Sequence, residues 1–137
     1  MNSKIFYSII ITVFLSTLNT TTPCFADTIQ KDECSELSQQ QPLNQCYAEL
    51  YRKTDKDLNE IYTKLITEMK SKGLSKDIEK LKVVQKAWIS YRDKTCNFDA
   101  ALYEGGSMQP MVHAVCLIAE TKHRIESLQN LMREYSR

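Results

Sequence analysis

The stretch that decides the fold reads Ala87-Trp88-Ile89-Ser90-Tyr91-Arg92-Asp93-Lys94-Thr95-Cys96. It holds the only tryptophan of the 137-residue chain, one of its five cysteines and an Arg-Asp couple. Side chains three or four residues apart share one face of a helix, so Arg92 can stack its guanidinium on the Trp88 indole. We therefore predict that Trp88, Tyr91 and Arg92 fill the core of a helical bundle, with Arg92 paired to an acidic residue of a neighbouring helix.

Apolar residues recur at steps of three and four on both sides of this stretch, which is the period of amphipathic helices. The first series runs from Leu43 to Met69. The second comprises Ile78, Leu81, Val84, Trp88, Tyr91, Thr95, Phe98 and Leu102, and the third comprises Met111, Ala114, Val115, Ile118, Ile125, Leu128, Met132 and Tyr135. Three helices of similar length joined by short turns pack best as an antiparallel bundle.

Glycine, proline and serine mark where these helices begin and end. Gly73 suits the left-handed residue that ends the first long helix, and Ser75 and Ser107 suit the amino caps of the next two. A short helix within residues 29–41 is expected before Pro42. The expected fold class is thus all-α, an antiparallel bundle of three long helices plus a short N-terminal helix, stapled by two disulfides.

The amino end has the layout of a secretory signal peptide. Lys4 precedes an apolar run of about eleven residues, shorter than the roughly 20 that a membrane-spanning helix needs. The small-residue exit before Asp27 predicts a signal peptide over residues 1–26 and a single domain over residues 27–137. A lipoprotein with Cys24 at its new amino terminus is the alternative, but Pro23 beside the scissile bond does not favour it.

After this cleavage the chain would carry 17 basic and 17 acidic residues and four cysteines. Zero net charge gives no basic excess to recruit nucleic acid or an anionic membrane. An even cysteine number behind a signal peptide predicts two disulfides in the periplasm or outside the cell. Cys96 and Cys116 lie at similar distances from the Gly105-Gly106 turn, so we predict that they pair and that Cys34 pairs with Cys46. Pairing of Cys46 with Cys96 would require a slip of about 7 Å along the helices.

The sequence offers no catalytic constellation, cofactor motif or convincing metal site. His113, Cys116, Glu120 and His123 could share a helix face, but they span about 15 Å, too far for one ion. No serine lies in a nucleophile-elbow pattern, and the many carboxylates are typical of solvated helix faces. We expect a protein that is not an enzyme.

The chain resembles the lysozyme inhibitor LprI-like family of exported bacterial proteins, formerly a domain of unknown function. The matching positions are Cys34, Asn44, Cys46, Asp57-Leu58-Asn59, Tyr62, Gln85, Ala87-Trp88-Ile89, Tyr91-Arg92-Asp93, Cys96, Gly105-Gly106-Ser107, Cys116, Thr121, Arg124 and Leu128. This resemblance implies an all-helical exported domain that inhibits lysozyme, with Arg124 joining the structural core.

For such an inhibitor we expect non-covalent occlusion of the glycan cleft of a c-type lysozyme. The turn Tyr103-Glu104-Gly105-Gly106-Ser107-Met108 is the predicted partner-binding site, because small residues let the backbone enter a groove. The alternative is a periplasmic module that binds or assembles with another envelope protein or a ligand, without inhibiting lysozyme. An acidic surface near the turn together with a buried Trp88 favours the first function, and an exposed aromatic groove or a cavity favours the second.

Overall fold

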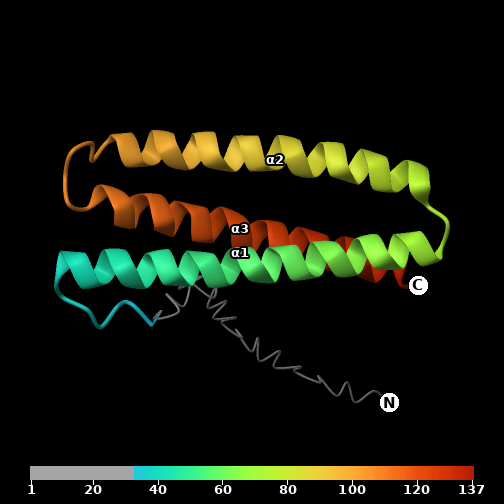
Figure 1. Ribbon diagram of the computed structural model, residues 1–137, viewed down its shortest axis with the longest axis horizontal. Helices are drawn as coiled ribbons and strands as arrows, with labels where there is room; N and C mark the ends of the chain where they lie inside the picture. The colour runs from blue at the N-terminus through green and yellow to red at the C-terminus, as the bar shows by residue number, and fades with distance from the viewer. Residues whose placement is uncertain (1–32) are drawn as a thin grey trace, which may run out of the picture. The chain divides into compact units, whose positions relative to one another are not determined.

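The computed structural model describes residues 33–137, which form an antiparallel three-helix bundle (Figure 1). Its helices are α1 (Gln40–Ser71), α2 (Ser75–Ala101) and α3 (Gln109–Tyr135), and no strand occurs within these residues. None of the three is long and apolar enough to cross a bilayer. The predicted all-α bundle is confirmed, whereas the predicted signal peptide lies outside the described residues.

Helix α3 is the central element of the bundle. It packs most extensively against α1 and less against α2, while α1 and α2 contact each other least. The apolar core lies toward the α1–α2 turn and consists of Leu58, Leu65, Met69, Ile78, Leu81 and Leu128. Trp88 and Tyr62 are among the partly buried side chains that surround it.

The predicted short N-terminal helix is wrong where the structure describes it. Residues 33–39 form turns and a bend, and α1 begins at Gln40, so that Pro42 lies inside its first turn. A proline is tolerated there because the backbone N–H groups of the first turn have no helical partner. The breaker role given to Pro42 therefore placed the start of the helix too late.

The turn between α1 and α2 is as predicted at Gly73, whose φ is 70°. The Leu74 N–H donates to the Met69 carbonyl at 3.0 Å and satisfies the end of α1. The predicted serine caps are wrong. The cap positions are Leu74 and Met108, neither of which makes a side-chain cap hydrogen bond, and Ser75 is already the first residue of α2.

Two disulfides staple the end of the bundle that holds the start of α1. Cys34 is bonded to Cys46 and Cys96 to Cys116, the two pairings predicted from the sequence. The second bond joins α2 to α3 at one level, as expected for an antiparallel hairpin. The alternative Cys46–Cys96 pairing is excluded.

The buried face of α2 differs from the predicted one. Its buried residues are Ile78, Leu81, Gln85, Arg92, Cys96 and Ala100. The predicted core positions Val84, Tyr91, Phe98 and Leu102 are exposed, so the prediction of Tyr91 as a core residue is wrong. On α3, Val115 is likewise exposed, while Leu117 and Thr121 are buried. Apolar periodicity missed this face because it is partly polar: Gln85 and Arg92 lie where an apolar series would be expected.

Candidate functional site

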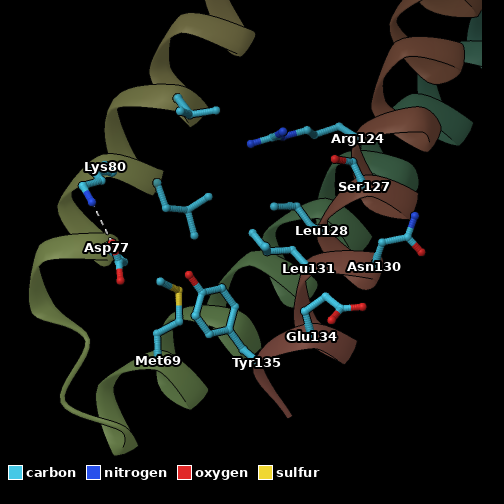
Figure 2. Close-up of a pocket in the computed structure, with 12 residues that line it drawn as sticks. Met69, Asp77, Lys80, Arg124, Ser127, Leu128, Asn130, Leu131, Glu134 and Tyr135 are labelled. Carbon is cyan, nitrogen blue, oxygen red and sulfur yellow. Dashed lines mark hydrogen bonds and ion pairs between the residues drawn. The ribbon is translucent and has the colours of Figure 1, made fainter. Parts of the chain in front are cut away.

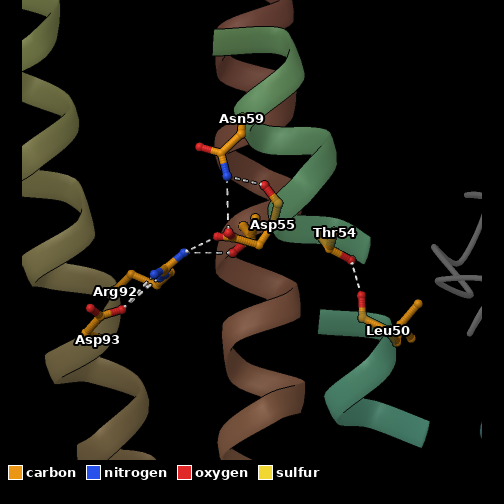
Figure 3. Close-up of polar contacts among 7 residues, drawn as sticks. Leu50, Thr54, Asp55, Asn59, Arg92 and Asp93 are labelled. Atoms are coloured by element: carbon orange, nitrogen blue, oxygen red, sulfur yellow. Dashed lines mark hydrogen bonds and ion pairs between the residues drawn. The ribbon is translucent and has the colours of Figure 1, made fainter. Parts of the chain in front are cut away.

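Arg92 ties the three helices together near the middle of the bundle. Its side chain is only 8% exposed and lies between Asp55 of α1 and Asp93 of α2 (Figure 3). It also contacts Thr121 of α3. Its Nε donates to Asp93 Oδ1 at 2.9 Å, and its Nη1 donates to Asp55 Oδ1 at 3.2 Å. The predicted ion pair with a neighbouring helix is therefore present.

The charges around Arg92 are balanced within the bundle. Asn59 Nδ2 donates to Asp55 Oδ2 at 3.2 Å and holds that carboxylate toward Arg92. Burial alone would lower the pKa of Arg92, but its hydrogen bonds to Asp93 and Asp55 raise the pKa above the usual value. A buried cation with two carboxylate partners is a structural tie, so this cluster is not the candidate binding site.

Trp88 lies between two arginines and is half-buried. The guanidinium carbon of Arg92 is 5.1 Å from the indole centroid and that of Arg124 is 5.8 Å away. The predicted stacking of Arg92 on Trp88 is thus present, and Arg124 adds a second cation–π contact. The Arg124 contact joins α3 to α2, whereas the Arg92 contact lies within α2.

The predicted partner-binding turn, residues 103–108, forms a compact loop at the disulfide end of the bundle. The Gly106 N–H donates to the Tyr103 carbonyl at 2.9 Å, and the Gly105 N–H donates to Gln109 Oε1 at 3.2 Å. Gly105 has a φ of 74°, which favours glycine. From α1, Asn44 Nδ2 donates to the Ser107 carbonyl at 3.0 Å. The loop is therefore held from both sides while its side chains stay exposed.

Exposed apolar side chains gather at this end of the bundle. Phe98 is 74% exposed and Leu102 is 80% exposed, and they lie four residues apart on one face of α2 and its last turn. Tyr103, Met108, Val115 and Leu37 are also exposed there. We call Phe98, Leu102, Tyr103 and Met108 the loop patch. Exposed apolar side chains concentrated at one end of a molecule are typical of protein–protein interfaces.

The charged residues are strongly segregated along the bundle. Residues 33–51 and 95–121 make up the loop end and contain six acidic residues but no lysine or arginine. The remaining described residues, 52–94 and 122–137, contain 16 basic and nine acidic residues. Glu33, Glu36, Glu49 and Glu104 are exposed at the loop end. A molecule of near-zero net charge therefore presents an acidic end and a basic body.

Sequence reasoning missed this segregation because it summed charge over the whole chain. The two long segments without lysine or arginine are visible in the sequence, and in an antiparallel hairpin they must meet at one end. It also missed Phe98 and Leu102 as surface residues, because their spacing suits a buried helix face as well as an exposed one. These two segments without lysine or arginine are the sequence signal that could have identified the acidic end of the bundle.

No group of three or more metal-ligating side chains occurs within residues 33–137. Cys116 is oxidised and so lost to a ligand set with His113, Glu120 and His123. Among the described residues, the features of the loop end suit recognition of a protein surface better than chemistry.

Comparison with known proteins identifies the family. Residues 32–128 match the family described as Lysozyme inhibitor LprI. An uncharacterized protein of Rhizobium meliloti (strain 1021) is 33% identical, over 73% of this chain and 78% of that protein. No solved structure matches. The matched segment spans all but the end of the three-helix bundle, both disulfides and the loop, so this chain belongs to the LprI lysozyme inhibitor family.

Proposed function

We propose that this protein is exported and inhibits a c-type lysozyme, with the loop end occluding the glycan cleft of the enzyme. The carrying observation is the coincidence of exposed apolar side chains and an acidic surface around one rigid loop. Cationic lysozyme would be steered toward the acidic end, and the loop patch would then be buried in the contact. Inhibition is non-covalent, because occlusion needs shape and desolvation but no reacting group.

The loop is well suited to enter a groove. Gly105 and Gly106 carry no side chain, and the Cys96–Cys116 bond and Asn44 restrain the loop on either side. A restrained loop loses little conformational entropy on binding, so more of the contact energy appears as affinity. Residues 1–26 would act as the export signal, and the disulfides would form after export.

The direct test mixes the oxidised protein, residues 27–137, with c-type lysozyme and measures both cell-wall lysis and binding. Leu102→Ser should weaken binding about tenfold or more, because truncating a central apolar contact typically costs 1–2 kcal/mol or more. Leu102 is exposed in the free protein, so its replacement should leave stability unchanged.

The matched control is Val83→Ser, an exposed apolar position at the other end of α2. It should inhibit as the unmodified protein does. Absence of inhibition at a large molar excess would end the proposal for that lysozyme. If the Leu102→Ser protein inhibits as strongly as the unmodified protein, the contact with lysozyme lies outside the loop patch.

A further inference from the structure

A cavity of about 510 Å³ lies between α2 and α3 at the end of the bundle opposite the loop. Figure 2 shows α2 on one side, α3 on the other and Met69 of α1 below. Its apolar wall consists of Met69, Leu81, Leu128, Leu131 and Tyr135. Asp77, Lys80 and Glu134 are among the polar residues at its edge. Its volume is in the range of sites that hold small organic ligands.

Arg124 extends from α3 across this cavity toward α2 (Figure 2). Its Nε donates to Gln85 Oε1 at 2.9 Å, which is a neutral partner. Its Nη2 is buried and has no hydrogen-bond partner among the described residues. Burial lowers the pKa of Arg124, whereas that of Arg92 is raised by its carboxylates. The two arginines on either side of Trp88 therefore differ: among residues 33–137, Arg92 has carboxylate counter-ions and Arg124 has none.

The carboxylates at the cavity edge are committed to other cations. Asp77 pairs with Lys80 at 2.9 Å, and Glu134 pairs with Arg137 at 2.9 Å. Arg124 lines the cavity and makes its hydrogen bond to the neutral Gln85, so an anion that enters the cavity can serve as its counter-ion. An apolar wall beside such a cation matches a ligand with an apolar body and an anionic head.

The geometry points to a second binding site in this cavity, for an amphipathic monocarboxylate whose head pairs with Arg124 and whose tail lies along Leu128 and Leu131 toward Tyr135. Eleven residues separate Arg124 from Tyr135, so the wall extends for about 16 Å along α3. The guanidinium suits a carboxylate because a hydrogen bond from this cation to an anionic oxygen is charge-assisted. This site is separate from the loop end and goes beyond lysozyme inhibition.

The test uses decanoate as the probe and Trp88, the only tryptophan, as the reporter. Decanoate should change Trp88 fluorescence saturably and shift backbone amide resonances along α2 and α3 at this end. Arg124→Met should weaken binding about tenfold or more, because charge-assisted hydrogen bonds contribute roughly 1.5–3 kcal/mol. Neutral 1-decanol and tailless acetate should each bind more weakly than decanoate.

Lys122→Met, two residues away on the exposed side of α3, is the matched control and should bind decanoate normally. Ser127→Phe, at an exposed rim position, should fill part of the cavity and weaken binding while leaving Arg124 in place. This variant tests the site even if the Arg124→Met protein folds poorly. Failure of decanoate to bind at millimolar concentration, or equal binding by the Arg124→Met or Ser127→Phe protein, would overturn the inference.

Discussion

Arg92 stabilises the middle of the bundle by contacts of three kinds. It pairs with two carboxylates, donates to Thr121 across the α2–α3 interface at 3.5 Å, and stacks on Trp88. Asp55 lies on α1 and Thr121 on α3, so this one side chain of α2 contacts both neighbouring helices. It adds a polar tie to the apolar core that lies nearer the α1–α2 turn.

Replacing Arg92 by Ala should lower the free energy of unfolding by about 2–3 kcal/mol, because a buried pair is broken and the packing on Trp88 is lost. This loss of stability falls short of the largest values known for broken buried ion pairs, because the Asp55 carboxylate is 37% exposed and can be hydrated once Arg92 is gone. Urea denaturation followed by circular dichroism measures it. In the Arg92→Ala/Asp55→Asn double variant, the loss of unfolding free energy should be smaller than the sum of the two single losses. A loss equal to that sum would show that the ion pair contributes nothing to stability.

Tyr51 gives a pH dependence of known sign. Burial raises its pKa above the usual value of 10.0, and nearby Arg92 opposes the rise. A raised pKa means that the folded protein holds the proton more tightly than the unfolded chain. The Tyr51 contribution to stability is therefore complete below about pH 10 and is lost as the pH rises through the folded pKa.

Ultraviolet absorbance during alkaline titration should accordingly show a late ionisation step that belongs to Tyr51. Tyr51→Phe should remove that late step and flatten the alkaline loss of stability. An unchanged titration curve in the Tyr51→Phe protein would contradict the assignment.

At the scale of elements, the α2–α3 hairpin depends on its disulfide. Replacing Cys96 and Cys116 by serine should cost about 3 kcal/mol on the chain-entropy model, because the bond closes a loop of about 20 residues. The loop patch should also become less ordered, so lysozyme inhibition should weaken along with stability. Thermal unfolding and the lysis assay measure the two effects.

The Cys34→Ser/Cys46→Ser protein is the matched control. Its bond spans 12 residues and should give a similar loss of stability, but it does not hold the loop directly. Inhibition should therefore be affected less at a temperature where both proteins are folded. Equal loss of inhibition in both would mean that general stability, and not loop order, sets affinity.

The helices, their turns and the disulfides could be predicted from the sequence, but the buried face of α2 could not. The period of three and four and the few glycines were enough for the all-α bundle, its turns and both disulfide pairs. They failed for the buried face of α2, because Arg92 and Gln85 are buried through polar contacts with α1 and α3 that no local pattern reports. The position of the loop was predictable, but the exposure of Phe98 and Leu102 around it depends on which face α2 turns toward α3.

Over the whole molecule, the separation of charge should govern how fast a cationic partner binds. Two segments that contain six acidic residues and no lysine or arginine lie together at one end, so association should be steered at low ionic strength. Raising salt from about 0.05 to 0.5 M shortens the screening length to a few ångströms and should slow association with lysozyme about tenfold or more.

Glu104→Lys should reduce both the association rate and its salt dependence. Glu126→Lys, an exposed acidic residue of α3 in the basic body, makes the same charge change away from the loop and is the control. Leu102→Ser should act mainly on the dissociation rate. Stopped-flow or surface-based kinetics separate these effects, and equal effects of the two charge changes would argue against steering by the loop end.

Both disulfides lie at the loop end, and the opposite end is held by packing and hydrogen bonds alone. Local unfolding should therefore begin at the end of the bundle that has no disulfide. Amide hydrogens at the Gly73 turn and in the last turns of α3 should exchange first, whereas those beside Cys96 and Cys116 and those of the core around Leu65 and Leu128 should exchange last. Fraying of the last turns of α3 would give a ligand repeated access to the cavity beside Arg124, while the disulfides keep the recognition end ordered.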